Sequence, residues 1–370
     1  MKLTVSERIA LSQRFNLADA HTRQSPNEDQ HTQIIDKIPA LYELAQNVEQ
    51  SSLEASCYQA LMSCNNQKGA LEHFPIPCYS ASMATEVVGN YLRLTGSQVA
   101  LTHPCFDNIA DILRRHEVTL SPIADDFYDD IEHMCRRIDE LAADYVFLVM
   151  PNNPTGKYLE KEEFTKLVSH CVRRRIGLIF DFCFRLYEQQ LCSYDQYEIL
   201  DGLSAEYIAI EDSGKIWPTL DQKVSFLICS GLARKKIAEI QDDFLLNVSP
   251  LSLLIVEEFA RLSLTCDCSD FRGLVKDNRA HLRKWLDAHG YLGWRSKSAD
   301  SHVSVEFIAT SEDSASAVSN ALERGVAILP GTAFYWSSHV SGRRTLRIAL
   351  ARDPDYFRTA LDTLDGLLVR

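Results

Sequence analysis

The sequence lacks the features of a protein that binds nucleic acid or crosses a membrane. Its 38 basic residues are outnumbered by 51 acidic ones, which gives a formal net charge of -13, whereas a nucleic-acid backbone requires a basic surface. No apolar run approaches the roughly 20 residues that span a bilayer, and residues 1–16 contain no apolar segment typical of a signal peptide. We therefore expect a cytoplasmic protein with neither a nucleic-acid nor a membrane partner.

The sequence also lacks a metal-binding motif and a nucleotide-binding motif. The eleven cysteines are scattered, and the one close pair, Cys266 and Cys268, has no nearby histidine to complete a metal site. We expect no bound metal and interpret the cysteines as reduced, buried thiols. The chain has no glycine-rich nucleotide loop of either usual kind. Its 370 residues have an ordinary globular composition and a length typical of two domains.

Three apolar runs end at polar residues, and this pattern directs the functional prediction. Residues 145–150 lead to Asn153, residues 176–180 lead to Asp181, and residues 208–210 lead through acidic and small residues to Lys215. A helical pattern lies between the first two runs, with acids early and basic residues late. This strand-helix-strand pattern predicts parallel strands, whose carboxyl ends meet at one crevice.

A lysine, an aspartate and an asparagine in one crevice form the set of side chains that pyridoxal phosphate requires. Among apolar neighbours, the Lys215 amine can form a Schiff base with a carbonyl group. Asp181 would hold the proton on the pyridine nitrogen, and Asn153 would bond the phenolic oxygen. Ser80, Ala81 and Ser82 lie at the start of a predicted helix, where free amides and hydroxyl groups can bind a phosphate. By itself this segment indicates only an N-cap, and its place in the order of the motifs favours the phosphate site.

These motifs, in this order, resemble fold-type I pyridoxal phosphate enzymes of the aspartate aminotransferase kind. The matching segments are Asn153 to Gly156, Asp181, Ser213 to Lys215, and Arg347. Three further segments resemble the subgroup of L-arginine oxidases and hydroxylases found in enduracididine-type biosynthesis; they are residues 16–21, 106–111 and 211–221.

The resemblance implies an α/β architecture. We expect an N-terminal arm over residues 1–32, a large domain with a mostly parallel, seven-stranded sheet between helices over 33–248, and a smaller α+β domain over 249–370. Relatives build each active site from two subunits, so a homodimer is expected. In the arm, Thr4 and Glu7 have the spacing of a capping box, which predicts a helix to about Arg14, and residues 23–32 are predicted to form a loop.

The resemblance also implies roles for individual residues. Catalytic roles are expected for Lys215, Asp181, Asp212 and His21. Cofactor contacts are expected from Phe106, which would stack on the ring, and from Ser80, Ala81, Ser82, Asn153, Ser213 and Lys223. Arg347 would bind the substrate carboxylate through two parallel hydrogen bonds, and further substrate contacts are expected from Thr4, Glu7, Asp19 and Asn108. The arm would close over the substrate, with His21 managing a proton.

One residue departs from the aminotransferase pattern. Related aminotransferases place a tyrosine three residues after the aspartate, where this chain has Phe184. The arginine oxidases share the substitution, and in them dioxygen oxidises the substrate without metal or flavin, giving 2-keto products with hydroxylation or unsaturation along the chain. Three alternatives stay open: a cyclase that dehydrates 4-hydroxyarginine to a cyclic guanidine amino acid, a class I/II aminotransferase, and a cofactor-binding regulator without activity.

Overall fold

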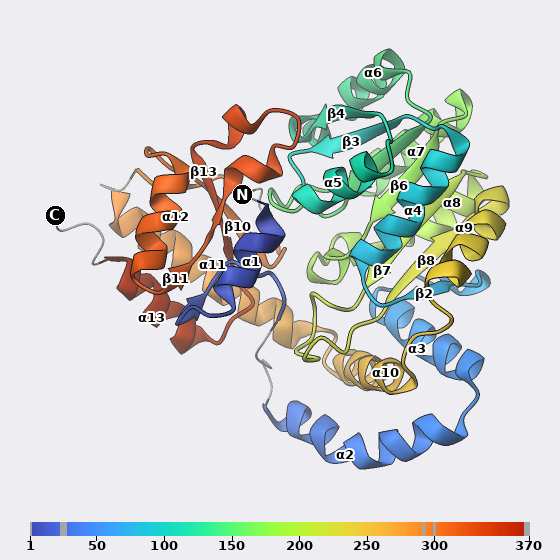
Figure 1. Ribbon diagram of the computed structural model, residues 1–370, viewed down its shortest axis with the longest axis horizontal. Coiled ribbons are helices and arrows are strands. Elements are labelled where there is room, and N and C mark those ends of the chain that lie inside the picture. Colours follow the sequence, from blue (N-terminus) through green and yellow to red (C-terminus); the bar gives the residue numbers. More distant parts are fainter. Residues whose placement is uncertain (1, 23–27, 291–292, 299–300, 366–370) are drawn as a thin grey trace.

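The computed structural model describes residues 2–22, 28–290, 293–298 and 301–365. Its elements form a larger half around an extended sheet and a smaller half made mainly from the last third of the chain (Figure 1). No helix in the described part of the chain is long and apolar enough to cross a membrane.

The larger half contains, among the described residues, a seven-stranded sheet in the order β2-β8-β7-β6-β5-β3-β4. The strands are β2 (Ile76–Cys78), β3 (Val99–His103), β4 (Leu120–Ala124), β5 (Tyr145–Val149), β6 (Gly177–Asp181), β7 (Tyr207–Asp212) and β8 (Ser225–Cys229). β8 is antiparallel to both of its neighbours, and the pairs from β7 to β4 are parallel. The predicted mostly parallel, seven-stranded sheet is confirmed.

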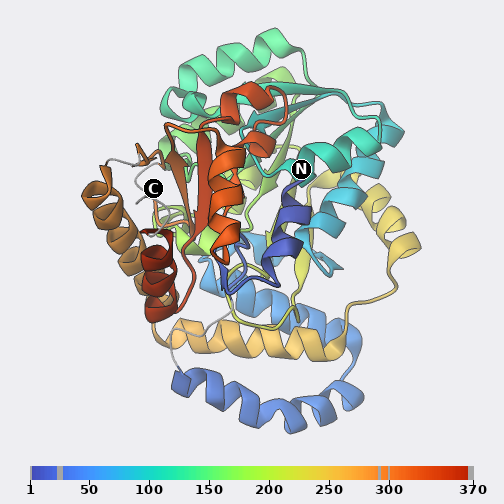
Figure 2. The same ribbon diagram turned by 60° about the vertical axis from the view of Figure 1, so that its left-hand side comes forward.

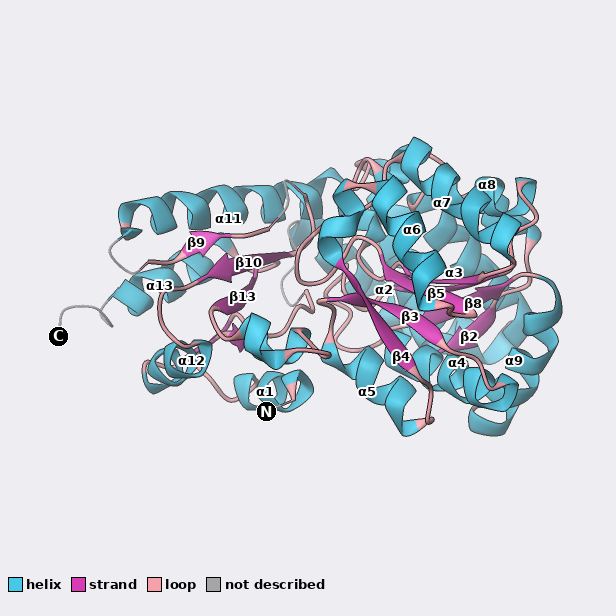
Figure 3. Cartoon of the chain, turned by 90° about the horizontal axis from the view of Figure 1, so that it is seen from above, coloured by secondary structure: helices cyan, strands magenta, loops and turns pink. Residues whose placement is uncertain are grey.

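Helices cover both faces of this sheet, as a parallel sheet requires. One face is covered by α4 (Ala81–Thr95), α5 (Asp107–Arg115) and α9 (Gly231–Phe244), and the other by α6 (Ile131–Leu141), α7 (Lys161–Arg174) and α8 (Gln196–Gly202), as Figure 3 shows. Alternate residues of β5 therefore enter different cores. Val146 and Leu148 pack in one cluster, and Phe147 and Val149 pack in the other.

Three helices form the base of the larger half. α10 (Pro250–Thr265) lies between α2 (Glu28–Asn47) and α3 (Gln50–Cys64) and packs against both (Figures 1 and 2). α2 is the outermost of the three, and it begins at Glu28. The prediction of a loop through Thr32 is therefore wrong for residues 28–32, because acids in the first turn of α2 favour an earlier helix start. Residues 23–27 of that predicted loop lie outside the described residues.

The smaller half has a four-stranded sheet in the order β12-β13-β10-β9 within the described residues. These strands are β9 (Arg295–Ser296), β10 (Val305–Ala309), β12 (Leu329–Pro330) and β13 (Thr345–Ala349), accompanied by α11 (Ser269–Ala288), α12 (Ser314–Glu323) and α13 (Pro354–Asp365). β13 pairs antiparallel with β10, with Phe307 opposite Arg347. This register fixes Arg347 in the centre of the sheet.

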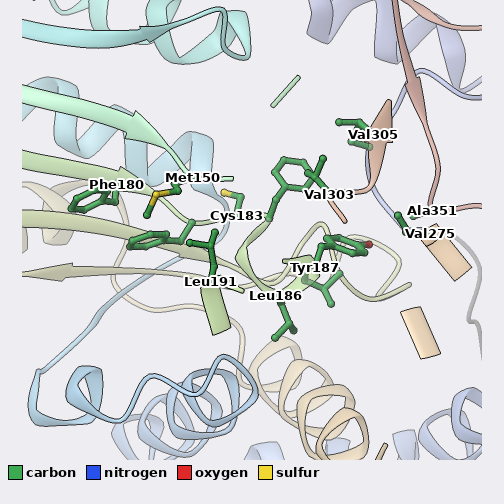
Figure 4. Close-up of a cluster of buried hydrophobic side chains, with 14 of the residues drawn as sticks. Met150, Phe180, Cys183, Leu186, Tyr187, Leu191, Val275, Val303, Val305 and Ala351 are labelled. Carbon is green, nitrogen blue, oxygen red and sulfur yellow. The ribbon is translucent and has the colours of Figure 1, made fainter. Parts of the chain in front are cut away.

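One hydrophobic cluster joins the two halves. It includes Phe180 of β6 and Tyr187 from the larger half, and Val303 and Val305 from the smaller half. In Figure 4 the labelled side chains extend from Phe180, beside the strands of the larger half, to Val303 and Val305 of the smaller half. Because the cluster is continuous, the carboxyl edge of the large sheet is held against the small sheet.

The N-terminal arm packs where the two halves meet. α1 (Leu3–Ala10) lies between α5 of the larger half and strands β11 (Val326–Ala327) and β12 of the smaller half. β1 (Phe15–Asn16) pairs in parallel with β11 (Figures 1 and 3). The predicted capping box is wrong. Lys2 is the N-cap residue without a side-chain cap bond, and the helix ends at Ala10 rather than near Arg14. Instead, Asp107 of α5 accepts a hydrogen bond from the Leu3 amide at 2.9 Å.

Candidate active site

The carboxyl ends of three neighbouring parallel strands bring the predicted polar residues together. Asp181 ends β6, Asp212 ends β7, and Asn153 follows β5 by four residues. The register pairs Val149 with Asp181, and Asp181 with Ile210. The chain then turns at Ser213 and Gly214 and presents Lys215 beyond the same edge. The strand ends thus place the lysine and the carboxylates at one crevice, as expected for a sheet of this type.

A pocket of about 530 Å³, which includes its open mouth, lies at this edge. Nine of the residues that the sequence suggested line it: Glu7, Ala81, Ser82, Phe106, Asn108, Asn153, Asp181, Lys215 and Arg347. They come from the arm, from the starts of α4 and α5, from the carboxyl edge of the large sheet, and from the small sheet. The pocket therefore depends on the way the two halves and the arm pack together.

Lys215 is in contact with a histidine from the arm. Its Nζ atom lies 3.1 Å from His21 Nε2, and His21 Nδ1 lies 2.5 Å from Asp19 Oδ1. The positive charge of Lys215, followed by burial, lowers the pKa of His21 to about 4. Burial opposes ionisation of Asp19, but its hydrogen bond to His21 and the charges of His21 and Lys215 hold its pKa well below the usual range. His21 is therefore a neutral base beside the lysine, oriented by a carboxylate.

Arg347 is fully buried on β13 and reaches the pocket from the small sheet. It donates to Asn153 Oδ1 and to Glu7 Oε1, both at 3.3 Å, and also to the carbonyl oxygen of Ala18. Burial raises the pKa of Glu7, against the opposing charge of Arg347. A buried guanidinium with one weakly bound carboxylate is suited to bind an anionic group of a ligand.

Comparison with known proteins identifies the family of this chain. Residues 78–364 match the family model for aminotransferases of class I and II. The chain belongs to this family. Because enzymes of the family use pyridoxal phosphate, the chain is a pyridoxal phosphate enzyme of fold-type I, as the sequence predicted.

Solved structures and one curated relative agree with this membership. A structure of MppP soaked with the product 2-ketoarginine is 29% identical, with a TM-score of 0.87 over 95% of this chain and 99% of that one. The aspartate aminotransferase of Thermus thermophilus, solved with maleate, shares the fold at 16% identity, with a TM-score of 0.77 over 100% of this chain and 97% of that one. The L-serine phosphate decarboxylase of Sulfurospirillum multivorans is 25% identical over 48% of this chain. That match spans 46%, about half, of the decarboxylase.

The aminotransferase-type pocket has groups that fit the ring of pyridoxal phosphate. Burial raises the pKa of the Asp181 carboxyl, whose Oδ1 atom accepts a hydrogen bond from the Cys183 amide at 2.9 Å. A protonated ring nitrogen of the cofactor would supply a positive charge to pair with the Asp181 carboxylate. Asn153 uses its oxygen for Arg347, which leaves its amide nitrogen to donate to a phenolic oxygen. Phe106 lines the same space.

Residues at the start of α4 fit the phosphate group of the cofactor. Ser80 is the N-cap of α4, and its Oγ accepts from the Met83 amide at 3.3 Å, while Ala81 and Ser82 line the pocket. Asn108 donates to Ser82 Oγ at 2.8 Å. A side chain at Gly214 would place a Cβ atom 2.8 Å from Lys223 Cδ. Glycine at this position therefore lets Lys223 pack against the loop that carries Lys215.

Seven predicted residues do not line this pocket: Thr4, Asp19, His21, Ser80, Asp212, Ser213 and Lys223. Thr4 is exposed on α1. Ser213 is buried, and its hydroxyl donates to the Val224 carbonyl and accepts from the Val224 amide, each at 2.9 Å. His21 and Lys223 line a neighbouring cavity, which Gly214 also borders, and Lys223 is paired with Asp221 at 3.2 Å.

Sequence reasoning missed two side chains that fix the lysine. Tyr187 and Thr22 each donate a hydrogen bond of 2.9 Å to the backbone carbonyl of Lys215. Phe184, where related aminotransferases have a tyrosine, lines the pocket. The hydrogen-bonding partners of Lys215 are distant in sequence, so no local pattern indicates them.

Proposed function

We propose that this enzyme oxidises L-arginine, or a close guanidino amino acid, with dioxygen as co-substrate. Arginine, dioxygen and water would give 2-ketoarginine, ammonium and hydrogen peroxide, and hydroxylation at C4 would be a further outcome. The likeness to MppP over nearly the whole of both chains supports the substrate class, because that structure holds 2-ketoarginine as a product. Glu7, which lines the pocket, supports a cationic substrate.

The observation that carries the proposal is the His21–Asp19 pair beside Lys215. His21 Nε2 lies 3.1 Å from the lysine amine, and Asp19 occupies the other ring nitrogen. Transamination needs one base at this position, the lysine itself. A second, neutral base allows a proton to be held at His21 Nε2 while Lys215 holds another. This supports chemistry that continues beyond a single proton shift.

The remaining side chains have consistent binding roles. Arg347 would bind the α-carboxylate, and Glu7 would face the guanidinium. Bound pyridoxal phosphate would act as the electron acceptor for the substrate Cα. Asp181 would keep a proton on the ring nitrogen, and the amides of Ala81 and Ser82 would hold the phosphate. The closed arm would exclude bulk water.

An aminotransferase is the second candidate, because the family match favours it. Phe184 argues against it. A tyrosine at this position would donate to the phenolic oxygen of the cofactor, and phenylalanine cannot. The pocket thus lacks one donor that transamination in related enzymes uses.

We also propose that the enzyme is a homodimer. The outer side of α2 carries Ile35, Ile38 and Tyr42, which are 49%, 39% and 60% exposed and follow helical spacing. A stripe of large apolar side chains on a surface helix is typical of a subunit interface. We propose that α2 packs against a second copy of the chain.

The deciding experiment is oxygen uptake with L-arginine, followed by mass analysis of the product. We expect uptake with arginine and a 2-keto acid, with or without a C4 hydroxyl group. L-Citrulline, which is nearly isosteric and uncharged, is the control and should be poor. Arginine turnover that requires a keto acid but no oxygen would establish an aminotransferase. Dehydration of 4-hydroxyarginine without oxygen uptake on arginine would establish a cyclase.

A further inference from the structure

The buried guanidinium of Arg347 has an internal counter-ion. Glu7 is the one carboxylate, in the described part of the chain, with a hydrogen bond to Arg347. Arg347 is 0% exposed, so its charge needs a partner when no ligand is bound. The same guanidinium is the group that would bind a substrate carboxylate. Glu7 and the substrate therefore compete for one cation.

The contact between Glu7 and Arg347 is weak enough to exchange. It is a single hydrogen bond of 3.3 Å, longer than the usual range for N–H···O bonds. Arg347 Nε is buried and has no hydrogen-bond partner in the described part of the chain. A free carboxylate can form two parallel bonds with a guanidinium, which is the stronger arrangement. An incoming carboxylate can therefore displace Glu7.

Displacement of Glu7 does not require the arm to leave. α1 is held at its first turn by two contacts with α5 that do not involve Glu7. Asp107 accepts from the Leu3 amide at 2.9 Å, and Lys2 pairs with Asp111 at 2.9 Å. Glu7 lies on the next turn and lines the pocket. A rotation of its side chain is sufficient to release Arg347.

We propose that Glu7 occupies Arg347 in the absence of substrate and is displaced by the substrate carboxylate, so that the freed Glu7 must find a second cation on the same substrate. This inference rests on the proposed role of Arg347. A carboxylate left unpaired in a buried site is costly. A ligand that has only a carboxylate leaves Glu7 unpaired, whereas a ligand with a cation at its far end pairs with Glu7. Glu7 thereby selects cationic amino acids twice, by competition and by pairing.

Other charges near Glu7 do not replace the substrate cation. Lys215 and Asp19 face it from the lysine loop and the arm, and their charges act on Glu7 in opposite directions. In the holoenzyme, Lys215 is committed to the cofactor. Asp19 is bonded to His21 and repels Glu7. The substrate is thus the source of the new positive charge.

Two unreactive ligands distinguish the displacement of Glu7 from Arg347 from the pairing of Glu7 with a cation on the ligand. Pentanoate and 5-guanidinopentanoate share a carboxylate and chain length, differ in the guanidinium, and lack the amine needed to react with the cofactor. Their dissociation constants would be measured by calorimetry on the holoenzyme, for wild type, Glu7→Gln and Arg8→Gln. Arg8 is exposed on the same helix and serves as the matched control.

The proposal predicts that Glu7→Gln changes the affinities for the two ligands in opposite directions. In Glu7→Gln, pentanoate should bind several-fold more tightly, because the internal competitor is gone. 5-Guanidinopentanoate should bind about tenfold more weakly or worse, because a charge-assisted bond is lost. Arg8→Gln should match wild type for both. If Glu7→Gln weakened both ligands, or changed neither, the exchange would be refuted. Oxygen uptake with arginine is measured separately, so its failure would overturn the proposed function without deciding this test.

Discussion

Lys215 has a fixed backbone and a side chain in contact with an ionisable neighbour. Tyr187 and Thr22 bind its carbonyl oxygen, and His21 lies at its amine. A lysine held in this way can exchange partners at Nζ without movement of the loop. Precise placement of the reacting group is a large part of its catalytic effect.

We predict that the cofactor is bound covalently at Lys215. The purified enzyme should be yellow, and borohydride reduction followed by peptide mapping should locate the pyridoxyl group on Lys215. Lys223 is the internal control, because it lies eight residues further on and is paired with Asp221. A pyridoxyl group on Lys223 would contradict the assignment.

We predict that His21 stays neutral through the physiological pH range. Lys215 and burial lower its pKa to about 4, so almost every ring is neutral near pH 7. The acid side of the kcat/KM profile should therefore show no step near pH 6.5, the usual histidine value. His21→Gln should change the product ratio while leaving cofactor binding intact. A step near pH 6.5 that His21→Gln removed would refute the assignment.

At the scale of the element, α1 has eight residues and cannot be stable alone. Its first turn is completed by Asp107, a residue of another helix. Its last residue, Ala10, is buried against the small half. The helix is therefore stable only where α5 and the small sheet meet, which is also the mouth of the pocket.

We predict that Asp107→Ala loosens the arm. Loss of an N-cap bond costs about 1 kcal/mol, which is a large share of the stability of so short a helix. Limited proteolysis near the N-terminus should accelerate, and the KM for arginine should rise, with an unchanged cofactor spectrum. Asp111→Ala removes only the partly exposed pair with Lys2 and should have a smaller effect. Equal proteolysis of wild type and Asp107→Ala would show that the cap is dispensable.

At the scale of the whole molecule, the outer stripe of α2 has no partner within the described part of the chain. The inner side of the same helix is satisfied, since Ile34 and Leu41 are buried in the core. A helix that is apolar on two sides is expected to lie between two packing surfaces. α10 supplies the first surface, and a second subunit would supply the other.

We predict a homodimer of about twice 41.9 kDa in light scattering. Ile38→Asp should shift the mass toward the monomer, because it places a charge in an apolar interface. Gln33→Asp, an exposed position on the same helix, adds the same charge and should remain dimeric. A wild type that is monomeric at micromolar concentration would refute the interface.

Local sequence patterns were sufficient to predict the strand ends that form the site. Apolar runs that end at Asn153, Asp181 and Asp212 indicate strands, and parallel strands bring their carboxyl ends to one edge whatever the rest of the chain does. Ser80 before α4 is a local helix signal, and the structure has it as the N-cap. These features depend on residues close together in the chain, so pattern and spacing suffice to predict them.

The contacts between side chains that are distant in the sequence depend on tertiary packing. His21 lies 194 positions from Lys215, and the arm reaches it by pairing β1 with β11. The spacing of Thr4 and Glu7 predicted a local cap, but Asp107 supplies that cap and Glu7 turns to Arg347. A buried cation attracts the nearest available carboxylate regardless of sequence distance. Which carboxylate is nearest depends on the packing of the whole molecule, and no local pattern contains that information.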